Sequence, residues 1–244
     1  MGLFKVYGKR TLRIPLIPIF LFIFPLVIMT AILFKQYGVL DSSIYQDSVA
    51  HPLVAGLSVV IILVVAVVNL PIIIVNAKTT NLLKRLKFSK VEYYEYYTAI
   101  FWLNFSFALV AEFALLTEAK FIFHVDYSSS DIFLMFLPFF LTYAFYYVIG
   151  ICIAGFCNNM EQNQVIVLPT YFALLFLSGS FIPFTSLPEK VGHYFIEFNP
   201  FYFFPELMNN TAKHMHFFSD VRVYSLVALF ILSFVLIQKK YQKV

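Results

Sequence analysis

The sequence predicts an all-α polytopic membrane protein with six transmembrane helices. Of its 244 residues, 61% are hydrophobic and 12% are charged, about half the charged fraction of soluble domains. The mean hydropathy is +0.84. Thirty-one Phe and sixteen Tyr residues supply more apolar surface than a core of this size can bury, so lipid must cover much of it. Six segments are also apolar over a length that crosses about 30 Å of hydrocarbon as a helix.

The six predicted spans belong to one transmembrane domain, residues 1–244. They lie at 15–34, 53–76, 98–117, 132–155, 165–182 and 221–237. The first span contains three prolines, so we expect a bend near its start. The second has Asn69 and Pro71 in its inner half. The sixth is short, and Arg222 at its outer end can extend its cationic side chain to the interface.

Basic residues indicate the orientation of these spans. With both termini inside, twelve of the seventeen Lys and Arg residues fall on the inner side and five on the outer side. The inner residues belong to the N-terminal tail, the loop after the second span and the C-terminal tail. Because cytoplasmic loops carry such an excess, the bias predicts an even number of spans with both termini in the cytoplasm.

The longest inner loop, residues 77–97, combines a basic helix with a second helix start. Leu82, Leu83 and Leu86 share one helical face, and basic residues surround the remainder. A capping box of Ser89 and Glu92 predicts a new helix that enters the third span. Such a loop can lie on anionic lipid headgroups or can offer a docking surface to a cytoplasmic partner. The rigid, two-sided helix favours docking.

The outer segment between the fifth and sixth spans, residues 183–220, has the features of a re-entrant hairpin. The apolar run before it breaks at Gly179 and Pro183. A short aromatic helix then follows a capping box of Ser186 and Glu189, and an Asn-Pro pair ends it. Irregular backbone at membrane depth is tolerated where protein or a cavity covers it. We therefore expect a helical hairpin that enters the bilayer from outside.

One acidic residue and three asparagines lie within the predicted spans. Glu112 is in the outer half of the third span. An ionisable residue at that depth usually faces a cavity or a partner, although a position close to the outer interface would keep it hydrated. Asn69, Asn76 and Asn104 are expected to form hydrogen bonds between helices.

The sequence contains no recognisable catalytic site. Gly150 and Gly155 have the spacing of a phosphate-binding loop, but Phe156-Cys157 follows in place of Lys-Ser/Thr, so we expect small residues for close helix contact. His214 and His216 have no third plausible metal ligand nearby. No serine lies in a nucleophile-elbow sequence. If the protein moves a substance uphill, the energy must come from elsewhere.

The spans, the capped basic loop and the motifs near the fifth span together resemble the ABC-2 type permeases of ABC transporters. That family has a Ser-Gly turn, an apolar-Pro pair, a Leu-Pro helix start and an Asn-Pro before its last span. The corresponding residues are Ser178-Gly179, Ile182-Pro183, Leu187-Pro188 and Asn199-Pro200. Residues 83–87 are similar to the family's coupling helix. Two departures are the short tail before the first span and Phe88-Ser89, where a Thr-Pro pair is frequent.

The resemblance implies the membrane half of an exporter. Two permease chains, identical or different, would pair in the plasma membrane above two ABC ATPase subunits. ATP and Mg²⁺ would bind to those ATPases, with no cofactor on this chain and no nucleic-acid partner. The residues implied in ATPase coupling are Leu82, Leu83, Lys84, Arg85, Leu86, Lys87, Phe88, Ser89 and Glu92. The candidates for the pathway or its exit are Glu112, Gly179, Phe181, Pro183, Phe195 and Phe198.

The aromatic, weakly charged composition favours an amphipathic or hydrophobic cargo, namely a peptide, a drug or a lipid. Exporters of the phenol-soluble modulin type handle such cargo. A gradient-driven secondary transporter or channel is the alternative, and it would need several buried ionisable groups. An intramembrane enzyme would show clustered His, Asp or Glu within its spans. A non-transporting partner of the same topology also stays open.

Overall fold

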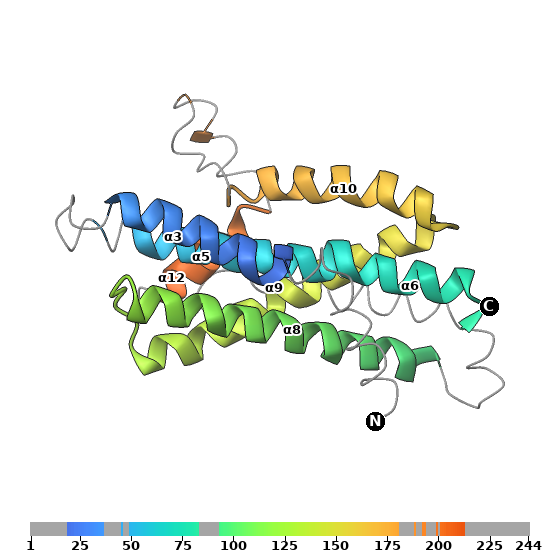
Figure 1. The fold of residues 1–244 in the computed structure, drawn as a ribbon, viewed down its shortest axis with the longest axis horizontal. Coiled ribbons are helices and arrows are strands. Elements are labelled where there is room, and N and C mark those ends of the chain that lie inside the picture. Colours follow the sequence, from blue (N-terminus) through green and yellow to red (C-terminus); the bar gives the residue numbers. More distant parts are fainter. Residues whose placement is uncertain are drawn as a thin grey trace.

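The computed structural model describes residues 19–36, 45, 49–82, 93–180, 188, 192–193, 199 and 201–212. These residues are mostly helical, with turns and short irregular segments between the helices, and they contain no strand. The long helices run side by side along the long axis of the bundle (Figure 1). The elements are η1 (Ile19–Ile23), α3 (Phe24–Gln36), α5 (His51–Leu63), η3 (Val64–Asn69), α6 (Leu70–Thr79), α8 (Tyr93–Phe121), α9 (Ser129–Phe156), α10 (Met160–Leu177) and α12 (Phe203–Ala212).

Within the described residues, three continuous helices are long and apolar enough to cross a membrane: His51–Thr79, Glu95–Phe121 and Ile132–Phe156. They correspond to the second, third and fourth predicted spans. The first predicted span corresponds to η1 and α3, whose apolar part is shorter. The fifth corresponds to α10. The sixth, 221–237, lies outside the described residues, so the six-span count and the orientation stay predictions.

The second span, which comprises α5, η3 and α6, is the central helix of the bundle (Figure 1). Its most apolar stretch is 89% buried inside the chain, against 50% for the third span and 44% for the fourth. A helix that is hydrophobic on every side belongs in a core, and the Val-rich and Ile-rich sequence of this span fits that position. The third and fourth spans keep large apolar side chains on the surface for lipid to cover.

The predicted irregularities at prolines appear as π-helical segments rather than as breaks. The segment η3 ends two residues before Pro71, and η1 ends two residues before Pro25. A proline ring clashes with the carbonyl group four residues earlier and cannot donate a hydrogen bond to it. A wider π turn at that place relieves the clash while the helix continues. The bend expected near the start of the first span stays a prediction, because its first two prolines lie outside the described residues.

The helix α10 begins and ends earlier than the predicted fifth span because of its caps. The Asn159 side chain accepts a hydrogen bond from the Gln162 backbone N–H at 2.8 Å, and Gln162 Oε1 accepts one from the Asn158 N–H at 3.0 Å. This reciprocal arrangement starts the helix at Met160, ahead of the predicted start of the fifth span at residue 165. At the other end, Gly179 has a φ of 68°, a left-handed conformation that ends helices and favours glycine.

Glycine spacing predicted close helix contact at two positions, and one prediction is confirmed. A Cβ atom on Gly150 would lie 2.0 Å from the Ala66 carbonyl oxygen, so α9 and η3 approach each other at a point where only glycine fits. The prediction for Gly155 stays untested, because the sixth predicted span lies outside the described residues. A Cβ atom there would meet none of the described atoms within 4 Å, because this residue lies on an exposed part of α9 near its end.

Aromatic side chains of α8 between residues 97 and 105 pack against aromatic side chains of α9 between residues 136 and 147. Phe101 contacts Tyr143 and Tyr147 with ring centroids 5.1 and 4.8 Å apart. The two tyrosine hydroxyl groups donate hydrogen bonds of 2.9 Å to the backbone carbonyls of Phe101 and Tyr97. Part of the high aromatic content therefore holds the bundle together, with the polar ends of the tyrosines satisfied.

The helix α12 was not predicted, since its residues were assigned to the irregular outer segment. It packs against α9 and α5 and lies behind them in Figure 1. Phe204 and Met208, one turn apart on its buried face, are each 1% exposed. The Phe204 ring lies 5.0 Å from that of Phe145 and 5.2 Å from that of Tyr146. The outer segment thus contributes a helix to the core of the bundle.

Candidate functional site

The predicted ATPase-coupling stretch, residues 82–92, connects the ends of two membrane helices. Leu82, which is partly buried against the core, belongs to the described residues, and 83–92 lie outside them. The preceding helix α6 ends at Thr79, and the following helix α8 begins at Tyr93. Any force applied to this stretch would therefore act directly on the second and third spans.

A sharp turn separates the coupling stretch from α6. The Thr80 hydroxyl group donates a 2.7 Å hydrogen bond to the Asn76 carbonyl, and the Asn81 N–H donates one of 3.1 Å to the Lys78 carbonyl. Asn81 then adopts a φ of 54°, a left-handed conformation that Asn tolerates better than most residues. The chain leaves the helix axis at a defined place.

The inner end of α6 is tied to α9 beside this turn. The Lys78 ammonium group donates a hydrogen bond to the Ala154 carbonyl in the last turn of α9. A cation at the C-terminus of a helix is favoured by the exposed carbonyls and by the helix dipole. Burial raises the pKa of the nearby Cys157 thiol, and the Lys78 charge opposes that rise. With the close contact at Gly150, this bond makes α6 and α9 a connected pair.

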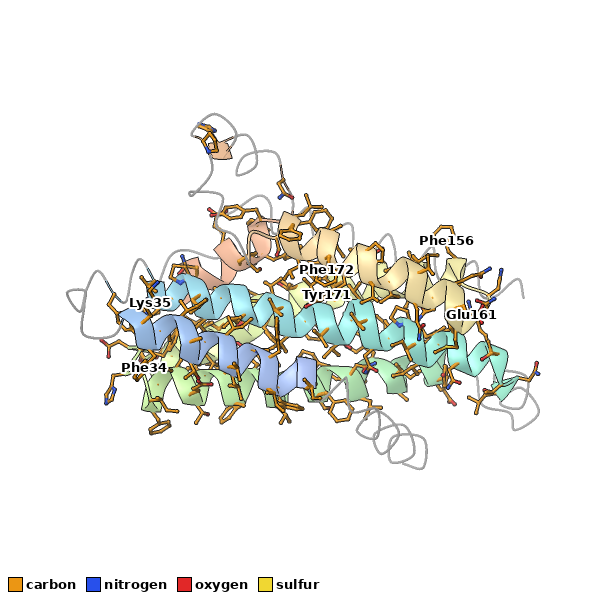
Figure 2. The ribbon with its side chains drawn as sticks, turned by 45° about the horizontal axis from the view of Figure 1, so that its top comes forward. Phe34, Lys35, Phe156, Glu161, Tyr171 and Phe172 are labelled. Atoms are coloured by element: carbon orange, nitrogen blue, oxygen red, sulfur yellow. The ribbon has the colours of Figure 1, made fainter. Side chains whose placement is uncertain are left out.

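The ends of the helices separate into two groups. Phe34 and Lys35, near the end of α3, lie at one end of the bundle, and Phe156 at the end of α9 and Glu161 at the start of α10 lie at the other (Figure 2). The sequence assigns the first pair to the outer side and the second to the inner side. Their placement at opposite ends is consistent with those assignments.

Two buried amides hold the second and third spans together. Asn69 Nδ2 donates a 2.7 Å hydrogen bond to Asn104 Oδ1, and both residues are almost completely buried. This confirms the predicted hydrogen bond between helices for that pair. Contacts of this kind within membranes contribute about 0.6 kcal/mol on average. For Asn76, the contacts described involve its backbone carbonyl.

Glu112 lies in the core of the bundle, where its side chain is 8% exposed. The Ser58 hydroxyl group on α5 lies 2.8 Å from Glu112 Oε1. Of the two alternatives from the sequence, a partner or hydration at the interface, the structure provides the partner. Moving an isolated carboxylate out of water costs several kcal/mol. Whether the Glu112 side chain is ionised or neutral therefore depends on the hydrogen-bond donors and charges around it.

The start of the predicted exit hairpin is a compact turn after α10. The N–H of Gly179 donates a 3.1 Å hydrogen bond to the Phe176 carbonyl, and the Ser178 and Ser180 hydroxyl groups lie 2.8 Å apart. The turn touches α5, because a Cβ atom on Gly56 would lie 3.2 Å from the Ser180 carbonyl oxygen. The remaining exit candidates lie outside the described residues: Phe181, Pro183, Phe195 and Phe198.

Asn199 connects this turn to α12, a role that the sequence analysis missed. Its side-chain amide donates a hydrogen bond to the Leu177 carbonyl at the end of α10. Its Oδ1 atom accepts a 3.0 Å hydrogen bond from the Phe201 N–H at the approach to α12. The sequence showed Asn199 as part of an Asn-Pro helix stop, and an Asn that precedes an apolar helical stretch is also a common cap.

These features define a polytopic helical membrane protein in which the predicted coupling stretch begins just after the well-defined end of α6. A family model for the ABC-2 type transporter matches residues 3–211. The chain therefore belongs to the ABC-2 type transporter family. It is a transmembrane permease component and not a nucleotide-binding domain, and permeases of this family generally partner with an ABC ATPase. No curated protein and no solved structure matches the chain.

Proposed function

We propose that this chain is the permease subunit of an ATP-driven exporter, with energy supplied by a separate ABC ATPase. The observation that carries the proposal, beside the family, is the position of residues 82–92 between α6 and α8. ATPase closure would move this stretch. The Lys78 bond to α9 would pass the movement to a second helix. Rigid-body coupling of this kind is a common route by which domain closure acts at a distance.

In this proposal, the coupling residues form a basic, two-sided helix on the ATPase. Their apolar face comprises Leu82, Leu83 and Leu86, and their cationic face comprises Lys84, Arg85 and Lys87. Phe88, Ser89 and Glu92 would form the junction with α8. Two permease chains and two ATPases would make the complete transporter, in the plasma membrane with the termini of this chain in the cytoplasm.

We further propose that the cargo leaves through an exit shaped by the segment after α10. Gly179 would allow the sharp turn, and Phe181, Pro183, Phe195 and Phe198 would supply an apolar, aromatic surface. Such a surface suits an amphipathic peptide, a hydrophobic drug or a lipid. The aromatic contacts between α8 and α9 account for part of the Phe and Tyr content, so the exit residues are a stronger argument for the cargo than composition.

Charge reversal in the coupling stretch tests the docking surface. The triple variant Lys84→Glu, Arg85→Glu, Lys87→Glu should reduce co-purification of the ABC ATPase encoded nearest to this chain at least tenfold, because three attractive contacts become repulsive. The matched control reverses three basic residues that are predicted outside, with Lys35→Glu, Lys190→Glu and Lys213→Glu. It changes the net charge equally and should leave co-purification intact.

Insertion must be checked as well, since loop charge also directs topology; Lys213→Cys is therefore introduced into both the wild-type chain and the triple variant. In the otherwise wild-type chain, Lys213→Cys should react with an impermeant thiol reagent from outside intact cells, and Lys87→Cys should not. If the triple variant inserts normally and still retains its ATPase, residues 82–92 are not the docking surface.

The alternative function, a gradient-driven transporter, is favoured by one observation, the buried carboxyl group of Glu112. Cargo export that continues after the ATPase gene is deleted and stops when the proton gradient is collapsed would support this alternative. Loss of export on deletion of the ATPase gene would support the permease.

A further inference from the structure

Where α5 meets α8, the Ser58 hydroxyl group lies within hydrogen-bond distance of two oxygen atoms but has only one proton to donate. Ser58 Oγ lies 2.9 Å from the Val54 carbonyl oxygen and 2.8 Å from Glu112 Oε1. A serine hydroxyl has a single proton to donate, and a carbonyl oxygen can only accept. If Ser58 donates to Val54, the contact with Glu112 is a hydrogen bond only when the carboxyl group supplies the second proton.

The surroundings of Glu112 favour the protonated form. The side chain is 8% exposed and that of Ser58 is fully buried. Among the described residues, Glu112 Oε2 is buried and has no hydrogen-bond partner. An ionised carboxylate accepts bonds at both oxygens and needs several donors or a cation when it is removed from water. One shared hydroxyl group does not meet that need.

The described charged groups on the neighbouring elements are remote from this position along the helices. α8 packs against η1, α3, α5 and η3, and its aromatic residues contact α9. On α5 the titratable residue is His51, seven residues or about 10 Å from Ser58 along the axis. On α3 the charged residue is Lys35, in the last turn, and on α8 the charged residues nearest to Glu112 in sequence are Glu118 and Lys120. Neither η1 nor η3 contains a titratable residue. In residues 132–151 of α9 the titratable residues are tyrosines, which are neutral at pH 7.

We propose that Glu112 is a proton-binding site: its carboxyl group is neutral, donates a hydrogen bond through Oε1 to Ser58 Oγ, and so completes a chain that ends at the Val54 carbonyl. Both short contacts are then hydrogen bonds, and no anion is buried. The bound proton links the third span to the second. This role is independent of the cargo and of the source of energy for transport.

Glu118 provides a natural comparison on the same helix. Its Oε1 contacts the Thr30 hydroxyl group, which lies 2.9 Å from the Leu26 carbonyl oxygen four residues earlier. The arrangement repeats that of Glu112, Ser58 and Val54. However, Thr30 is exposed and Glu118 is half-buried, so water can supply the donors that an ionised carboxylate needs. The two glutamates share a bonding pattern and differ in burial, which makes Glu118 a matched control.

Infrared difference spectra between the wild-type chain and each variant test the proposal directly. The full-length chain, reconstituted in phosphatidylcholine vesicles at neutral pH, should show the carbonyl-stretch band of a protonated carboxylic acid. Glu112→Gln should remove that band, and Glu118→Gln should leave it unchanged. A wild-type spectrum without the band, or a Glu112→Gln spectrum that retains it, would overturn the proposal.

A second variant covers the case in which Glu112→Gln does not fold. Ser58→Ala removes the acceptor and keeps the acid, so the band should remain and shift to higher frequency as its hydrogen bond is lost. A band that does not move would show that the protonated acid is not bonded to Ser58, and the proposal would fail.

Discussion

Gly150 shows how one missing side chain determines the spacing of two helices. A methyl group there would lie 2.0 Å from the Ala66 carbonyl oxygen and 3.0 Å from Leu70 Cδ2. The first of these neighbours is backbone and cannot rotate away. Any larger residue must therefore push α9 away from the central helix, which also carries the coupling stretch.

We expect Gly150→Ala to lower the free energy of unfolding by about 1–3 kcal/mol, the usual effect of overfilling a close contact. Gly155→Ala on the same helix is the control. Its Cβ atom meets no described atom within 4 Å, so it should be neutral or slightly stabilising, as alanine is in exposed helix positions. Thermal unfolding of the two purified variants in one detergent measures the difference. Equal melting temperatures would contradict the close approach.

Single residues differ in how well the sequence predicts them. Asn69 and Asn104 were predicted to bond between helices because an amide within an apolar span needs a partner. The role of Ser58 was not predictable, since a serine in an apolar helix has no pattern of its own. Its significance comes from Glu112, fifty-four positions away in the chain. Contacts of that kind depend on how the helices are placed, which periodicity alone does not specify.

The helix α12 is a short element that places a large aromatic side chain in the core. Its Phe204 ring is 1% exposed and contacts two aromatic residues of α9. We expect Phe204→Ala to cost about 3 kcal/mol, as large-to-small changes at buried aromatic positions do. Phe113→Ala is the control, because Phe113 is 71% exposed on the outside of α8 and should change stability by less than about 0.5 kcal/mol.

Chemical or thermal unfolding of both variants in the same lipid or detergent separates these cases. A loss of stability confined to Phe204→Ala would support α12 as part of the bundle. Similar behaviour of the two variants would contradict its position against α9.

The long elements were predictable and the short one was not, for a physical reason. The second, third and fourth spans are uninterrupted apolar stretches, which form helices in a membrane whatever their neighbours do. α12 spans ten residues and contains polar Glu206, Asn209 and Asn210. Its helical signal was the pair Phe204 and Met208 on one face, and the many turn-forming residues before it obscured that signal. α10 was misplaced by a few residues because caps, rather than hydropathy, define its ends.

The described part of the molecule consists of a buried central helix with the other helices around it, and its contacts link the end of α6, where the coupling stretch begins, to the core. The coupling stretch follows α6, α6 is tied to α9 through Lys78 and Gly150, and α9 carries α12. α12 is in turn joined to the turn after α10 through Asn199. These contacts form a continuous route from residue 82 to the start of the proposed exit.

ATP hydrolysis tests the central claim most directly. The ABC ATPase encoded nearest to this chain is assayed in lipid nanodiscs with the wild-type permease, with the triple charge-reversal variant at residues 84, 85 and 87, and without permease. The account predicts hydrolysis that depends on the permease and falls at least severalfold in the triple variant, while the outer triple variant behaves as wild type. Hydrolysis that is the same in all samples would contradict an ATP-driven permease coupled through residues 82–92.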